Sequence, residues 1–89
     1  MFTQTIQSKI RACFDYRGAN LSFIDVKDNG AKMYIRPGAP WDILWAEVVP
    51  TGKTYTLTLL WKGASKGDPH VWEDLTLATV VKTLKFYRG

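Results

Sequence analysis

Residues 67–74, GDPHVWED, hold the side chains with the most obvious capacity for chemistry in this chain. The only histidine, His70, stands here close to three acids, Asp68, Glu73 and Asp74. A zinc site needs three or four His, Cys or carboxylate ligands. A Ser or Cys nucleophile needs a histidine that is itself oriented by a third group. The segment therefore raises the question of a metal or catalytic centre.

Too many partners are missing for either kind of centre. Only carboxylates accompany His70, and no GxSxG pattern occurs in the sequence. The simpler interpretation is the approach to a helix, with Asp68 in a turn and Glu73 and Asp74 at the positive helix N-terminus. A partner contact, or a metal or catalytic role, remains as an alternative. We accordingly predict no catalytic residue, no metal ligand and no cofactor, and we do not expect an enzyme.

The positive charge is unevenly distributed along the chain. Twelve Lys and Arg residues oppose eight Asp and Glu residues, for a net charge of +4. No acid follows Asp74, whereas Lys82, Lys85 and Arg88 add three cations. A basic balance favours acidic partners such as nucleic acid. The alternative is that these cations only complement the dipole at a helix C-terminus.

Residues 21–36, LSFIDVKDNGAKMYIR, are typical of a β-hairpin. Asn29-Gly30 between two β-type runs is a strong signal for a type I′ turn. A turn at that position pairs Val26 with Met33 and Ile24 with Ile35, and these four face the helices. The other face of the hairpin carries Phe23, Asp25, Lys27, Lys32, Tyr34 and Arg36.

That second face has the composition of a surface for single-stranded nucleic acid. Aromatic rings stack on bases, at about 1–3 kcal/mol per base, and Lys and Arg neutralise phosphates. Two alternatives to nucleic-acid binding remain for this face. In the predicted pairing Phe23 lies across from Arg36, so these two side chains could stack on each other. The charged face could also serve solubility alone. The predicted nucleic-acid-binding residues are Phe23, Lys27, Lys32, Tyr34, Arg36, Lys82, Lys85 and Arg88.

Four tryptophans are many for 89 residues. Trp61 follows the inward alternation of residues 53–62 and is predicted to be core. Trp41 and Trp72 flank loops, and we predict that they contact a partner, since Trp is enriched at interface hot spots. The alternative is that they cover the edge of the core.

Hydrophobic periodicity predicts the elements that position these residues. Ile6, Ile10, Cys13 and Phe14 form the apolar stripe of a helix over 4–16, capped by Thr3 or Thr5. A strand is favoured over 43–49, with a helix over 41–49 as the alternative. Apolar residues at helical spacing between 77 and 87 predict the final helix. A short strand near residues 73–77, before this helix, is an alternative.

The predicted fold class is α+β: an N-terminal helix, a four-stranded antiparallel sheet and a C-terminal helix, with both helices on one face of the sheet. Residues 1–89 form a single small domain. One cysteine, no signal peptide and no apolar run long enough for a membrane span predict a cytoplasmic protein.

The leading functional hypothesis is a non-enzymatic module that binds nucleic acid or a nucleoprotein complex. The alternative is an inhibitor or adaptor that binds a larger protein complex through tryptophans and loops. A homodimer is compatible with either.

Overall fold

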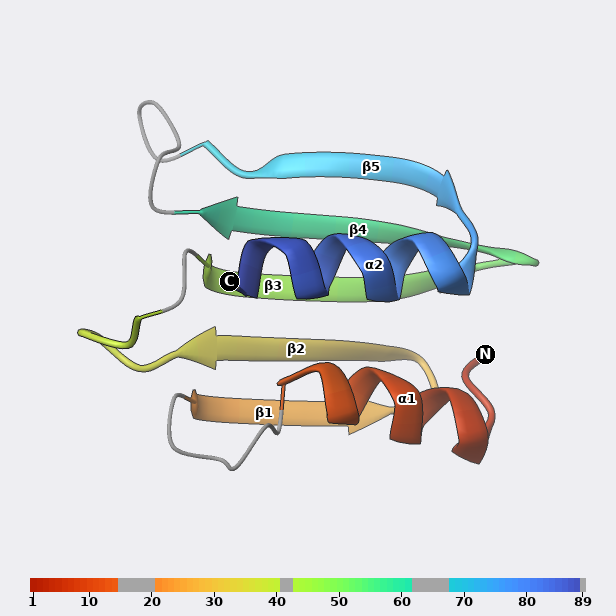
Figure 1. The fold of residues 1–89 in the computed structure, drawn as a ribbon. Helices are drawn as coiled ribbons and strands as arrows, with labels where there is room; N and C mark the ends of the chain where they lie inside the picture. The colour runs from red at the N-terminus through yellow and green to blue at the C-terminus, as the bar shows by residue number, and fades with distance from the viewer. Residues whose placement is uncertain (15–20, 41–42, 62–67, 89) are drawn as a thin grey trace.

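The computed structural model describes residues 1–14, 21–40, 43–61 and 68–88, and only the backbone of Phe14 and Arg88. A five-stranded antiparallel sheet follows the chain order β1-β2-β3-β4-β5, and two helices lie on one of its faces (Figure 1). The elements are α1 (Gln4–Phe14), β1 (Leu21–Lys27), β2 (Gly30–Ile35), β3 (Ile43–Thr51), β4 (Thr54–Trp61), β5 (His70–Leu75) and α2 (Leu77–Arg88). The α+β class and the helix arrangement are confirmed, and the sheet has five strands where four were predicted.

The additional strand is the segment that was interpreted as a helix start. Residues 70–75 pair with β4, so that His70 lies opposite Leu59 and Trp72 opposite Leu57. The prediction that Glu73 and Asp74 sit in the first turn of the last helix is therefore wrong. The hydroxyl of Thr76 takes the capping role instead, because it accepts a 3.2 Å hydrogen bond from the backbone N–H of Thr79.

Helix α1 begins where the sequence predicted it. Thr3 Oγ1 accepts a hydrogen bond from the N–H of Ile6 at 3.2 Å. The apolar stripe turns Ile10 and Cys13 into the core, so the prediction of a buried Cys13 is confirmed. Helix α1 packs over β1 and β2, and helix α2 packs over β4 (Figure 1).

The core fills the space between the helices and the inner face of the sheet. Each strand from β1 to β4 contributes residues to it, and in β2 and β4 these residues alternate along the strand, as period-two patterning requires. Its fully buried members include Ile10, Met33, Ile43, Val48, Leu57, Leu59, Val80 and Leu84. In β4, Tyr55 and Trp61 pack against this cluster, which confirms the predicted inward face of that strand.

The first hairpin keeps its predicted faces but not its predicted register. The turn residues are Asp28 and Asn29, and Lys27 pairs with Gly30. This moves the pairs from Phe23 to Lys27 by two residues, so that Ile24 lies opposite Met33 and Phe23 opposite Tyr34, and the register shifts again between Leu21 and Phe23. Because the side-chain period is two, a shift of two preserves which residues face the core. The predicted Phe23–Arg36 pairing is wrong.

Neither helix of the described chain has the length and apolar character needed to cross a bilayer.

Candidate functional site

The face of the sheet turned away from the helices carries a row of large side chains that crosses four strands, and three of the four are aromatic. Phe23 of β1 lies opposite Tyr34 of β2, and Tyr34 lies opposite Trp45 of β3. Trp45 in turn pairs with Leu60 of β4. We call Phe23, Tyr34, Trp45 and Leu60 the aromatic row. The two rings nearest the sheet edge are the most accessible, with 47% of Phe23 and 40% of Tyr34 exposed.

The first two rings of this row contact each other. The centroids of Phe23 and Tyr34 are 5.7 Å apart and their planes are inclined by 54°. The Nζ of Lys32 lies over the ring of Tyr34, 5.8 Å from its centroid, within the range of a cation–π contact. A planar ligand that stacks on Tyr34 therefore meets a cation beside it.

A second row on the same face is charged and alternates in sign. Asp25, Lys32 and Glu47 are cross-strand neighbours on β1, β2 and β3. Lys27 is paired with Asp25 at 3.4 Å, and both side chains are largely exposed. Exposed pairs of this kind contribute little to stability. The face is thus close to electrically neutral, which the sequence interpretation of a basic face did not anticipate.

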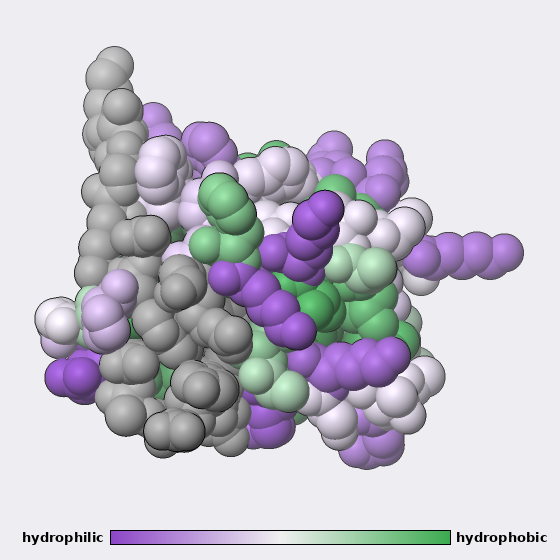
Figure 2. Space-filling view, viewed as in Figure 1, coloured by the Kyte–Doolittle hydropathy of each residue, from purple (hydrophilic) through white to green (hydrophobic). Residues whose placement is uncertain are grey.

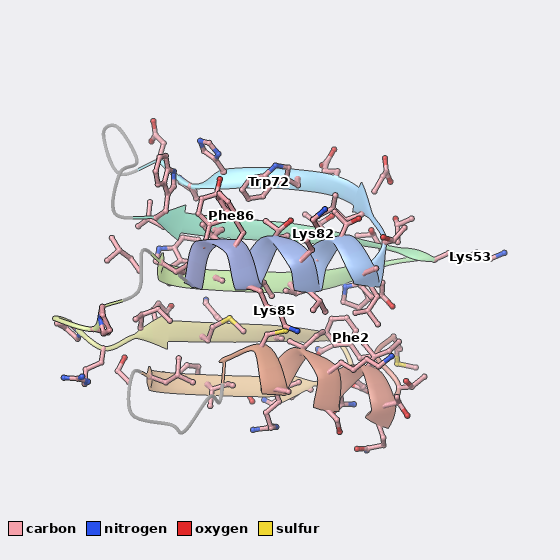
Figure 3. All side chains as sticks on the ribbon, viewed as in Figure 1. Phe2, Lys53, Trp72, Lys82, Lys85 and Phe86 are labelled. Atoms are coloured by element: carbon pink, nitrogen blue, oxygen red, sulfur yellow. The ribbon has the colours of Figure 1, made fainter. Side chains whose placement is uncertain are left out.

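The predicted nucleic-acid-binding residues fall into two groups on opposite layers. The structure brings Phe23, Tyr34, Lys27 and Lys32 together on the helix-free face, and Arg36 is exposed one residue beyond β2. Lys82 and Lys85 lie on α2, in the helical layer, together with the backbone of Arg88 (Figure 3). A short ligand on the aromatic row cannot touch both groups.

Trp45 and Leu60 were not among the predicted site residues. Their positions follow from the alternation of β3 and β4, because Ala46 and Val48 face the core and leave Trp45 and Glu47 to the other side. A bulge between Ile43 and Trp45 makes the pattern irregular at the strand start, so that Leu44 is also exposed. The ambiguity of residues 41–49 concealed this signal in the sequence.

The two predicted partner-binding tryptophans have different outcomes. Trp41 lies outside the described residues. Trp72 is half-buried on the helix side of β5, where its ring lies 6.2 Å from that of Tyr87 and 5.5 Å from that of His70. Trp72 therefore covers the edge of the core, and its remaining exposed surface lines a hollow beside Phe86 (Figure 3).

His70 belongs to the same aromatic cluster rather than to a set of ligands. It packs edge-on against Trp61 at 6.1 Å and against Trp72. Across residues 1–14, 21–40, 43–61 and 68–88, no group of three His, Cys, Asp or Glu side chains is placed to hold a metal ion. Of the acids near His70 in the sequence, Asp74 accepts a hydrogen bond from the hydroxyl of Thr54 at 3.4 Å.

No family model, curated protein or solved structure matches this chain.

Proposed function

We propose that the chain is a small non-enzymatic binding module that holds single-stranded nucleic acid on the helix-free face of its sheet. The aromatic row is the observation that carries the proposal. Exposed rings on adjacent strands offer successive stacking surfaces, and any base can use them because every base has a π-face. Recognition of single strands by aromatic side chains on an open sheet is an established physical solution.

Phosphate contacts should contribute only a small part of the binding affinity, because few cations surround the aromatic row. Lys32 lies beside Tyr34, Lys27 is farther along β1, and Arg36 is just beyond the end of β2. Asp25 and Glu47 offset part of this positive charge. Stacking should therefore supply most of the affinity. With at most three phosphate contacts, the logarithm of the binding constant should fall with the logarithm of salt concentration with a slope of about −2.

The cations of α2 lie too far from the aromatic row to contact a ligand bound there. Lys82 and Lys85 are separated from the aromatic row by the thickness of the sheet and the helical layer (Figure 1). Exposed charges separated by more than about 10 Å are largely screened near 0.1 M salt. Their contribution to binding on the aromatic row should therefore be small.

The experiment compares matched substitutions on the two layers. Fluorescence anisotropy measures binding of labelled single-stranded DNA, single-stranded RNA and duplex at about 50 and 200 mM salt. Tyr34→Ala should weaken single-strand binding by about 1–3 kcal/mol. The control is Phe86→Ala, which removes a 74%-exposed ring from the helical layer and should leave affinity unchanged.

A second pair of variants separates local contact from overall charge. Lys32→Glu with Arg36→Glu changes the net charge as much as Lys82→Glu with Lys85→Glu does. The first pair should weaken binding more than the second, because its cations lie beside the aromatic row. Equal losses from both pairs would show that the charge of the whole molecule, and not the sheet face, attracts the nucleic acid. Unchanged affinity in a folded Tyr34→Ala variant would refute stacking on the row.

A protein partner on the same face is the second candidate. The alternation of Asp25, Lys32 and Glu47 favours it, because a near-neutral apolar surface with signs of both kinds suits a protein interface. An inhibitor or adaptor role of this kind predicts no oligonucleotide binding at low salt. It also predicts capture of a protein partner that is lost with Tyr34→Ala and insensitive to salt.

We infer a cytoplasmic setting for either function. The chain has one cysteine, which is buried in the core, so it forms no disulfide within the chain, and a small domain without disulfides suits a reducing compartment. Sedimentation analysis of the free protein tests whether a homodimer forms through the exposed row.

A further inference from the structure

A groove runs between the two helices on the opposite side of the molecule from the aromatic row. Its lining consists of Lys9 of α1 together with Leu77, Ala78, Val81, Lys82 and Lys85 of α2, and its volume is about 620 Å³. A hollow of about 310 Å³ with Ala12 and Cys13 shares Lys9, Val81 and Lys85 with it. We call the combined depression the interhelical groove.

Small side chains explain why the groove is open. Ala12 on α1 and Ala78 and Val81 on α2 are too short to fill the space between the two helix axes. The floor is consequently apolar, and Figure 2 shows it as a hydrophobic patch between projecting hydrophilic side chains. Leu77 and Val81 remain only half-buried there.

The rim of the groove carries charge of one sign. The lining includes the cations Lys9, Lys82 and Lys85, and residues 4–14 and 77–88 include no Asp or Glu. Lys85 extends from α2 toward α1, and Lys82 projects from the same helix (Figure 3). The helical layer is therefore the cationic side of the molecule, in contrast to the near-neutral sheet face.

We propose that the interhelical groove binds an acidic amphipathic helix of a partner protein. Two helices on a sheet leave a channel along their axes, and a third helix fits such a channel by packing its apolar ridge between them. Leu77 and Val81 bury the apolar stripe of the incoming helix. Carboxylates flanking that stripe meet Lys9 on one side and Lys82 and Lys85 on the other.

Charge and polarity together select this occupant. Nucleic acid would satisfy the lysines but would leave the apolar floor against phosphate and sugar. The part of α2 that lines the groove, from Leu77 to Lys85, is about 12 Å long, which accommodates somewhat more than two turns of a partner helix. The site is independent of the aromatic row, so either proposal can fail alone.

The test uses a synthetic peptide of defined pattern. An acetylated and amidated peptide of about 18 residues, built from Leu, Ala and Glu with leucines at three- and four-residue spacing, is long enough to form a helix. Titration into the ¹⁵N-labelled full chain should shift the amide signals of Leu77, Ala78, Val81, Lys82 and Lys85. A peptide of the same composition in scrambled order is the control for charge alone.

Two variants with matched controls locate the binding. The double substitution Lys82→Glu with Lys85→Glu should lower the affinity for the peptide by at least about tenfold, since it reverses both charges on one rim. Lys53→Glu, on the far β3–β4 turn (Figure 3), should change affinity by less than about twofold. Ala78→Gln inserts a polar side chain into the floor and should also weaken binding, whereas Ser8→Gln on the exposed part of α1 should not.

The outcomes separate this proposal from its competitors. Saturable shifts confined to the groove, lost in the groove variants and retained in the controls, support it. No shift with the patterned peptide, or equal binding of the scrambled one, overturns it. Groove shifts produced instead by a single-stranded oligonucleotide or by phosphatidylglycerol vesicles also overturn it, and they identify a phosphate or a lipid surface as the occupant.

Discussion

Phe23 lies directly across from Tyr34 on the helix-free face, with ring centroids 5.7 Å apart. The two rings are inclined to each other by 54°, and 47% of Phe23 and 40% of Tyr34 remain exposed. The pair is therefore both a cross-strand contact that stabilises the hairpin and the most accessible part of the candidate site. Its two contributions require separate measurements.

The stabilising contribution of the pair follows from a double-mutant cycle. Phe23→Ala and Tyr34→Ala should each lower the free energy of unfolding, and the coupling between them should be about 0.5–1 kcal/mol, as for other cross-strand aromatic pairs. Urea denaturation of the wild type, both single variants and the double variant measures it. Losses that add within about 0.3 kcal/mol would mean that the rings do not interact.

Asp74 should tolerate glycine better than a β-branched residue. It has a φ of 56°, and it lies with Glu73 opposite Thr56, where the pairing of β4 and β5 shifts by a residue. This left-handed conformation costs an ordinary L-residue about 1–2 kcal/mol, but it costs glycine nothing.

Asp74→Gly should therefore change the free energy of unfolding by less than about 0.5 kcal/mol, whereas Asp74→Val should lower it by about 1–2 kcal/mol. Loss of the 3.4 Å hydrogen bond from Thr54 is common to both variants and cancels in the comparison. Thermal unfolding measures the difference. Equal stability of the two variants would contradict the assigned backbone conformation.

Thr76 should act as the N-cap of α2. Its hydroxyl accepts a hydrogen bond from the N–H of Thr79, and its carbonyl accepts one from the N–H of Val80 at 3.0 Å. Thr76→Ala removes the first of these and should cost about 0.5–2 kcal/mol of stability. Thr76→Ser keeps the hydroxyl and should retain most of the stability. A serine variant as unstable as the alanine variant would assign the effect to the methyl group.

The first hairpin shows which information a local pattern contains. Alternation predicted the faces of residues 23–35 because burial of Val26, Met33 and Ile35 depends only on a period of two. The exact register depends on which two residues form the turn. Asp28 and Asn29 do so, and neither has a positive φ, so the type I′ preference for Asn29-Gly30 did not decide the pairing.

Residues 70–75 show where a local pattern misleads. Two acids before an apolar periodic run are typical of a helix N-terminus. The strand forms because His70, Trp72 and Leu75 all reach the helix side, and the irregular pairing at Glu73 and Asp74 accommodates the spacing of three between the last two. An irregularity of this kind breaks the alternation by which a strand is recognised.

Trp45 should contribute to single-strand binding as much as Tyr34 does, although the sequence did not distinguish it from the other tryptophans. Its ring continues the aromatic row from Tyr34 toward Leu60. Trp45→Ala should weaken binding of single-stranded DNA by about 1–3 kcal/mol, or roughly 5- to 150-fold, and Trp45→Phe should restore most of it because a stacking ring remains.

The matched control is Leu44→Ala, which removes an exposed apolar side chain from the adjacent position. Since Trp45 is half-buried, affinities are compared only at temperatures at which circular dichroism shows every variant folded. A Trp45→Ala variant that binds as the wild type does, beside a Tyr34→Ala variant that does not, would confine the stacking surface to β1 and β2 and shorten the bound strand accordingly.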